Sequence, residues 1–406
     1  MQAFWQWTIY LPGPVTGNVT RLKVMHTLIT AMRLTAILVC CCLAADVPAQ
    51  EAGQRGVIHS SDDDTSVVSL HYGGSDGLRR SAPESLEHIR QVEIDYGTTL
   101  TSDDVAFLSS LEGVSDIWIG GNLQSEYVTI ESDLLPLSKL KHLENLFLCK
   151  RDMQDKDLAF VAELPEIQYL EFLADTNPWN EKGLAVTDDC ANYLCHATTL
   201  RHLLIYWGDN LTDRFISEIS QSLEHLEHLD VDSSRLTDNA LQMLAQRCTK
   251  LKWLDVRSNL FTDKGVGHLA NAKRLEMLWL QSESLSHQCI ESVAGLVRLR
   301  HLELTVPTVT DGAVRTLANL PELEILALRQ PPLTDEQFAM FENHPTLESA
   351  FINGRDLTEA NVIRVIKTIP NLRHLNVGAK NWALQNAIYE LMKGRQNASM
   401  SAKAGG

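Results

Sequence analysis

Residues 251–263 read LKWLDVRSNLFTD, and the same arrangement returns at 275–287 (LEMLWLQSESLSH), 299–311 (LRHLELTVPTVTD) and 323–335 (LEILALRQPPLTD). Each stretch opens with apolar residues in the order Leu-x-x-Leu-x-Leu, with conservative replacements, and the next stretch begins 24 residues later. A fixed spacing of this length is typical of a chain built from stacked repeats. The repeat therefore decides the fold.

The pattern is present along most of the chain. It begins at Ile89, Val114, Leu143, Ile167, Leu200, Leu226, Leu251, Leu275, Leu299, Leu323, Leu347 and Leu372. The alternating apolar residues predict a short strand, and a following Leu-Thr-Asp predicts a helix that begins after a threonine cap. Each unit alone lacks a second layer to cover its apolar face, which a stacked neighbour provides. We therefore expect about twelve parallel strands in one continuous α/β domain over 86–378.

The best-preserved unit resembles the leucine-rich repeat superfamily. Leu251, Leu254, Val256, Asn259 and Phe261 match its pattern Leu-x-x-Leu-x-Leu-x-x-Asn/Cys-x-Leu position by position. The helical second half of each unit is similar to the ribonuclease-inhibitor-like and cysteine-containing subtypes. The resemblance implies a horseshoe-shaped solenoid, with parallel strands on the concave face and helices on the convex face.

One position departs from this family pattern. Where the pattern has asparagine, other units carry Ser234, Glu283, Pro307, Pro331 and Arg355. The hydrogen-bonded asparagine ladder of the family is therefore mostly missing, and we expect other groups to satisfy the backbone of these turns.

The amino-terminal residues predict export. Residues 32–50 read MRLTAILVCCCLAADVPAQ, in which Arg33 precedes an apolar stretch of 12 residues, 34–45, and a small-residue cleavage pattern. The apolar stretch is shorter than the roughly 20 residues that cross a bilayer, so no stable membrane span is expected. We expect residues 1–49 to be a signal peptide with an upstream extension, cleaved after Ala49, and the protein to be secreted or located in the periplasm or cell envelope.

The segments on either side of the repeats are expected to differ from them. Residues 50–85 are polar with little periodicity, which predicts a flexible lead or an N-terminal cap. Residues 379–406 are expected to form a C-terminal capping helix followed by a disordered tail, because the last repeat needs a cover for its apolar face.

Composition and motifs argue against several classes of function. The 406 residues carry a formal net charge of −17, which repels phosphate backbones and argues against a nucleic-acid partner. No phosphate-binding loop, nucleophile elbow or zinc-protease motif is present in the sequence. The five cysteines after the signal lack a Cys-x-x-Cys pair, so we expect buried free thiols. We expect no catalytic residues, no metal and no cofactor.

The residues that flank the second and third leucines are expected to project from the concave face, because the leucines point inward. These candidate ligand-binding residues are Trp118, Phe147, Tyr169, His202, Tyr206, His228, Asp230, Asp232, Trp253, Asp255, Trp279 and Phe351. Asp230 and Asp255 occupy matching positions on strands about 4.8 Å apart, where side-by-side like charges destabilise a sheet. This pair, beside tryptophans expected to be exposed, predicts a site for a protein partner with a basic and partly apolar surface.

The leading interpretation is a non-enzymatic, exported protein-binding scaffold. One alternative is a substrate-recognition adaptor of a ubiquitin ligase-like complex, although residues 50–85 are too short and polar for the F-box helix bundle of such proteins. Another is an enzyme that uses concave-face acids, for which no triad is visible. Three local alternatives also stay open: ordinary solvent-facing strand residues, a cation between Asp230 and Asp255, and a binding loop around Trp179.

Overall fold

The computed structural model describes residues 57–60, 68–72, 89–94, 98–120, 128–173, 186–233, 235–378 and 384–393. The chain divides into two compact units, residues 1–53 and 54–406, and all described residues belong to the second unit. The expected signal peptide, the expected tail over 394–406 and the loop around Trp179 lie outside the described residues.

Fourteen strands form one sheet, in the order β1-β2-β3-β5-β7 and then β8 to β16 in sequence. They are β1 (Val57–Ser60), β2 (Val68–Tyr72), β3 (Ile89–Ile94), β5 (Asp116–Ile119), β7 (Asn145–Leu148), β8 (Tyr169–Leu173), β9 (His202–Tyr206), β10 (His228–Asp232), β11 (Trp253–Arg257), β12 (Met277–Gln281), β13 (His301–Thr305), β14 (Ile325–Pro332), β15 (Ser349–Asn353) and β16 (His374–Asn376). All neighbours from β2 to β16 pair in parallel, and β1 pairs with β2 antiparallel. The twelve strands from β3 to β16 in this sheet confirm the parallel sheet expected from the repeat. Two short strands, β4 (Thr99–Leu100) and β6 (Thr129–Ile130), form a separate pair.

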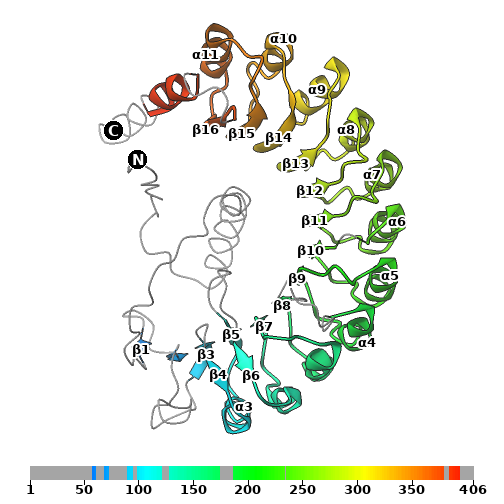
Figure 1. Cartoon of the computed structure of the whole chain (residues 1–406), viewed down its shortest axis with the longest axis vertical. Coiled ribbons are helices and arrows are strands. Elements are labelled where there is room, and N and C mark those ends of the chain that lie inside the picture. The colour runs from blue at the N-terminus through cyan, green and yellow to red at the C-terminus, as the bar shows by residue number, and fades with distance from the viewer. Residues whose placement is uncertain are drawn as a thin grey trace. The chain divides into compact units, whose positions relative to one another are not determined.

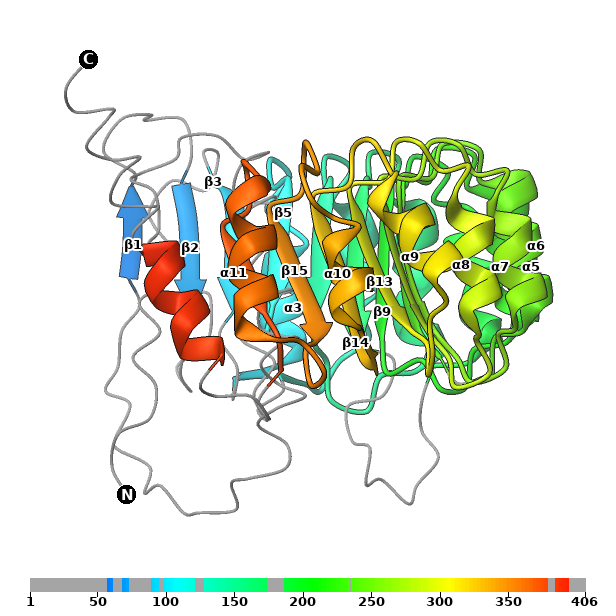
Figure 2. The same ribbon diagram turned by 90° about the horizontal axis from the view of Figure 1, so that it is seen from above.

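A helical segment follows most of these strands and covers the outer side of the sheet, as Figure 1 shows for α4 to α11. The α-helices are α3 (Ser102–Leu108), α4 (Ala191–Leu194), α5 (Asp213–Ser222), α6 (Asp238–Arg247), α7 (Asp263–Leu269), α8 (His287–Val293), α9 (Asp311–Ala318), α10 (Asp335–Ala339) and α11 (Glu359–Thr368). The 3₁₀ segments are η1 (Leu135–Lys139), η2 (Asp155–Glu163) and η3 (Asp188–Cys190). Figure 2 shows the strands and helices of successive repeats running side by side. This arrangement confirms the α/β solenoid, with the sheet on the concave face and the helices on the convex face.

The apolar core lies between the sheet and the helices. The repeating leucines point into it, and Leu229, Leu254, Leu278 and Leu302 on four neighbouring strands are fully buried. From the helix side the same core receives residues at helical spacing, such as Leu241 and Leu244 of α6. The core is therefore one continuous layer that every repeat shares with its neighbours.

The expected threonines are the N-cap residues of helices α5, α6, α7, α9 and α10. In six repeats the aspartate that follows the cap residue has a second role. Its carboxylate accepts two hydrogen bonds from the cap residue of the next repeat, one from the backbone N–H and one from the hydroxyl. The pairs are Asp155–Thr187, Asp188–Thr212, Asp213–Thr237, Asp238–Thr262, Asp263–Ser286 and Asp335–Thr358. We call this set the Asp–Thr ladder.

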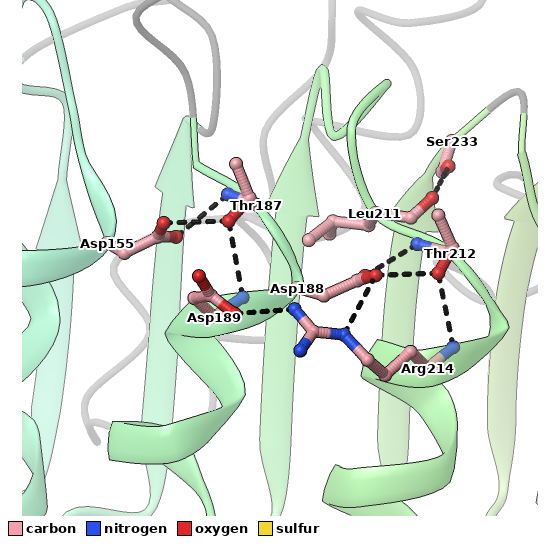
Figure 3. Close-up of polar contacts among 8 residues, drawn as sticks. All are labelled: Asp155, Thr187, Asp188, Asp189, Leu211, Thr212, Arg214 and Ser233. Atoms are coloured by element: carbon pink, nitrogen blue, oxygen red, sulfur yellow. Dashed lines mark hydrogen bonds and ion pairs between the residues drawn. The ribbon is translucent and has the colours of Figure 1, made fainter.

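Figure 3 shows two steps of the ladder. The Asp188 carboxylate accepts from Thr212 N at 2.7 Å and from Thr212 Oγ1 at 2.6 Å, and Arg214 approaches the same carboxylate at 3.4 Å. Thr212 Oγ1 in turn accepts from the backbone N–H of Arg214 at 3.2 Å, which caps helix α5. One threonine therefore caps its own helix and joins it to the preceding repeat.

Buried serines make hydrogen bonds to backbone groups of the turns in which the family pattern has asparagine. Ser233 and Ser282 stand one residue before the asparagine position and are fully buried. Their hydroxyls donate to the carbonyls of Leu211 and Phe261 in the preceding repeat, at 2.7 and 2.8 Å. Because each serine also accepts a backbone N–H two residues further on, it holds the turn after its strand.

The two ends of the repeat array carry further elements. Strands β1 and β2 fall within the 50–85 segment that was expected as a flexible lead or a cap, and both belong to the large sheet. At the other end residues 384–393 are helical, and Leu384, Ile388 and Met392 are buried in the common core.

Removal of a core leucine tests the shared layer. Leu254 and Leu302 are fully buried, and truncation of such a side chain leaves a cavity, so Leu254→Ala and Leu302→Ala should each lower the free energy of unfolding by about 2–5 kcal/mol. Urea unfolding followed by circular dichroism measures the loss. A loss below about 0.5 kcal/mol at both positions would contradict their place in the core.

Two glycines of helix α7 test the Asp–Thr ladder. A Cβ atom on Gly265 would lie 2.1 Å from Asp238 Oδ1, whereas on Gly267 its nearest neighbour is Ser292 Oγ at 3.9 Å. Alanine favours a helix over glycine, so Gly267→Ala should stabilise the protein by about 0.5–1 kcal/mol. Gly265→Ala should instead destabilise it by about 1–3 kcal/mol, because it displaces the Asp238 carboxylate from Thr262. Equal shifts in urea midpoint for the two variants would refute this role of Asp238.

Candidate functional site

The concave face consists of columns of side chains, one from each strand. Parallel pairing places Tyr169, His202, His228 and Trp253 at equivalent positions of β8 to β11, as the first column. The second column lies two residues further along each strand. It contains Trp118, Phe147, Asp230, Asp255, Trp279 and Phe351. Tyr206 and Asp232 lie two residues beyond that, in a third column, so all twelve predicted residues are on the concave face.

The structure brings six of these residues into one chain of ring contacts, the aromatic ladder. It consists of Trp118, Phe147, Tyr169, His202, His228 and Trp253. Successive ring centroids lie 5.0 to 6.1 Å apart, which is the range of favourable tilted and edge contacts. From Tyr169 on β8 to Trp253 on β11 the rings are register partners on neighbouring strands about 4.8 Å apart. Trp118 joins this row from the second column through its contact with Tyr169, and Phe147 contacts Trp118.

Asp230 and Asp255 are register partners, as expected. A positively charged side chain that the sequence interpretation missed, Arg257, lies beside Asp255. Arg257 Nε is 3.6 Å from Asp255 Oδ1, and Arg257 Nη1 is 3.7 Å from Asp232 Oδ2. The signal for Arg257 was present in the sequence, since it lies two residues after Asp255 and so shares its face. The acidic pair is therefore part of a mixed charge cluster, which consists of Asp230, Asp232, Asp255 and Arg257.

The same arginine covers a tryptophan that was expected to be exposed. The Arg257 guanidinium lies 4.4 Å from the centroid of the Trp279 ring, and Trp279 is only 3% exposed. The expectation of an exposed Trp279 is therefore wrong, because a long side chain on the next column lies over its ring. Trp253 and His202 are half-buried and keep part of their surface on the concave side.

Two further acids of the second column were missed by the sequence interpretation. Glu171 on β8 accepts a hydrogen bond from the Tyr169 hydroxyl, and Glu303 on β13 is the register partner of Trp279. Both are buried. Each stands between apolar or aromatic positions of its repeat, so the sequence pattern alone offered no reason to select it.

A histidine of the first column lies among apolar neighbours. His301 is the register partner of Met277 and Ile325, and burial lowers its pKa to about 4. Burial lowers the pKa of His202 in the same column as well. Both imidazoles are therefore neutral at pH 7.

The described residues offer little for a metal or for nucleophilic chemistry. They contain no group of three or more His, Cys, Asp or Glu side chains placed to hold a metal ion. All five of their cysteines are free thiols, as expected, and only Cys195 is partly exposed. Burial raises the pKa of Cys149, Cys248 and Cys289 to about 12, so these thiols stay protonated and unreactive. Within these residues no helix is long and apolar enough to cross a membrane.

A parallel sheet built from consecutive repeats, with helices on its outer side, gives this chain the fold of a leucine-rich repeat solenoid. No protein-family model and no curated protein matches its sequence. Solved structures similar to it include an internalin (inlF) from Listeria monocytogenes, at 20% identity and a TM-score of 0.47, over 76% of this chain and 79% of the other.

Two other solved structures show similar arrangements. The yeast Rad7–Elc1 complex matches at 16% identity and a TM-score of 0.44, over 63% of this chain and 76% of the other. The plant peptide hormone receptor RGFR1 in complex with RGF2 matches at 12% identity and a TM-score of 0.37, over 71% and 54%. At these identities and scores the assignment rests on the repeat and the sheet of the chain itself.

The half-buried imidazole of His301 predicts a pH dependence of stability. Its folded pKa of about 4 is lower than the ordinary value of 6.5, so the unfolded chain binds a proton first as the pH falls. Stability from this group is complete above pH 6.5 and decreases by up to about 3 kcal/mol toward pH 4. His301→Asn should make the decrease shallower in urea unfolding series between these pH values.

His374 provides the matched control, because it occupies the same column at the end of the sheet and is exposed. His374→Asn controls for the loss of a histidine from this column. Equal slopes for the wild type and the His301 variant would show that burial of this imidazole does not influence stability.

Proposed function

We propose that this protein is a non-enzymatic, exported scaffold that recognises a protein partner through its concave face, and that the partner surface is basic and partly apolar. The observation that carries the proposal is the aromatic ladder beside the mixed charge cluster, which meet at strands β10 and β11. Aromatic side chains at the centre of a surface, surrounded by charged groups, are typical of the residues that dominate binding energy.

The charges of the concave face favour a basic partner. At the concave positions of β8 to β13, all of which are described, the acids are Glu171, Asp230, Asp232, Asp255 and Glu303. Against them stands the single guanidinium of Arg257 at these positions. An excess of one sign steers partners of the other sign and disfavours acidic ones.

The apolar part of the partner follows from the rings. Trp118, His202 and Trp253 are half-buried, so each keeps an apolar edge or face that a partner side chain covers on binding. Burial of such surface contributes about 25 cal/mol per Å². A partner that carried charge alone would leave this surface in water, so we expect apolar residues beside its basic ones.

Export is proposed from the sequence of residues 32–50. Fractionation of the source cells tests it, with the mass of the purified natural protein as the readout. Protein that begins at Gln50 in the extracellular or periplasmic fraction supports the proposal. Exclusively cytoplasmic protein that keeps residues 32–49 overturns it.

Binding is tested with the variant Trp253→Ala/Asp255→Asn in affinity capture from the native extracellular or periplasmic fraction. Both side chains belong to the concave face and not to the apolar core, so the variant should fold while its affinity for the captured partner falls at least about tenfold. The matched control is Glu291→Ala/Val297→Ala, two exposed positions in and after helix α8 on the convex side. Binding by the concave variant as tight as that of this control would refute the concave site.

A further inference from the structure

Arg257 lies on the concave face and makes no side-chain hydrogen bond to any residue that the structure describes. Its guanidinium rests on the Trp279 ring at 4.4 Å and has Asp232 and Asp255 on its two sides. The two ion-pair distances, 3.7 and 3.6 Å, exceed those of hydrogen bonds between charged groups, which are about 2.7–2.9 Å. The contacts therefore hold the charge in place, and they leave Nε and Nη2 without a hydrogen-bond acceptor among the described residues.

The N–H donors of Arg257 need hydrogen-bond acceptors. A guanidinium carries five N–H donors, and Arg257 Nε and Nη2 are buried with no hydrogen-bond acceptor among the described residues. A buried donor without an acceptor costs free energy. A movement of the guanidinium toward an incoming group would loosen two long ion pairs and the contact with Trp279, and it would break no hydrogen bond to a described residue. Arg257 can therefore donate to a group that approaches it.

The surrounding charges select the kind of acceptor. Asp232 and Asp255 flank the guanidinium, and Asp230 is the register partner of Asp255. A carboxylate or phosphate of a partner would be repelled by these three acids. A neutral main-chain carbonyl accepts the same N–H groups without that repulsion, and a cationic side chain beside it gains from the acids.

We propose that Arg257 is the specificity-determining residue of the concave site. It donates hydrogen bonds to a main-chain carbonyl of a partner segment that carries a lysine or arginine next to that carbonyl. The inference rests on the proposed binding function. It states that the concave site recognises a peptide carbonyl and a cationic side chain together. A cation without a carbonyl satisfies only the acids and leaves the arginine donors unpaired.

Two probes separate these contributions. The peptide acetyl-Leu-Lys-Leu-Lys-Leu-amide carries cations and carbonyls, whereas spermine carries cations and no carbonyl. Titration calorimetry at physiological salt should give binding of the peptide to Arg257→Ala about tenfold weaker than to the wild type. Spermine should bind this variant as tightly as the wild type or more tightly, because a like charge has been removed.

A conservative variant provides the rescue. Arg257→Gln keeps two N–H donors on a neutral group, so it should recover part of the peptide affinity. A merely structural arginine would produce a different result, in which both probes weaken together and the urea midpoint falls. Tighter binding of the peptide to Arg257→Ala would show that the arginine only competes with the ligand cation, and no peptide binding to the wild type at about 1 mM would equally overturn the inference.

The inference and the proposed function fail in distinguishable ways. The affinity of the captured partner for the Trp253→Ala/Asp255→Asn variant tests the concave face, and it does not depend on the two probes. The ratio of peptide to spermine affinity reports on Arg257, without reference to the partner. A partner that depends on Trp253 and Asp255, together with an unchanged probe ratio in Arg257→Ala, would keep the binding function and reject the role of the arginine.

Discussion

Parallel pairing in exact register is the constraint on which this structure depends. Each repeat must place its strand about 4.8 Å from the preceding one, with Leu254 beside Leu229 and Leu278. A shift by one residue would turn these leucines toward the concave side and bring the concave charges into the core. From Leu251 to Leu347 the 24-residue spacing returns each strand to the same register, although the helices between the strands differ in length.

Polar groups at the turns reinforce this register at the outer edge of the core. In the Asp–Thr ladder a carboxylate such as Asp213 holds both the N–H and the hydroxyl of Thr237 in the next repeat. Buried serines such as Ser233 join neighbouring turns in the same direction. These hydrogen bonds stand where the leucine-rich repeat pattern has an asparagine ladder. They bring neighbouring repeats so close that only a residue without a Cβ, Gly265, fits beside the Asp238 carboxylate. The aspartate of each ladder pair is thus a link between repeats.

The same register brings the side chains of the concave site together and also reduces how much of their surface stays exposed. Equivalent side chains of adjacent strands are close enough to touch, so rings form a continuous ladder and like charges meet. Asp230 and Asp255 are tolerated side by side within a cluster that includes Arg257, which also lies over Trp279. The concave face is therefore more tightly packed than an ordinary strand surface, and its half-buried members, such as Trp253 and His202, provide the accessible part.

The sequence by itself determined the solenoid, the twelve parallel strands and the face to which each candidate side chain belongs, because these follow from the periods of 24 and of 2. It also located the threonine caps, which depend on the residues next to them in the chain. Only the tertiary structure decided that the aspartates of these caps bind the next repeat, that Arg257 joins the acidic pair, and that Trp279 is covered. These contacts join residues of different repeats across distances of a few ångströms. Such contacts depend on the conformations in which long side chains lie over their neighbours. A linear pattern of residue types does not contain that information.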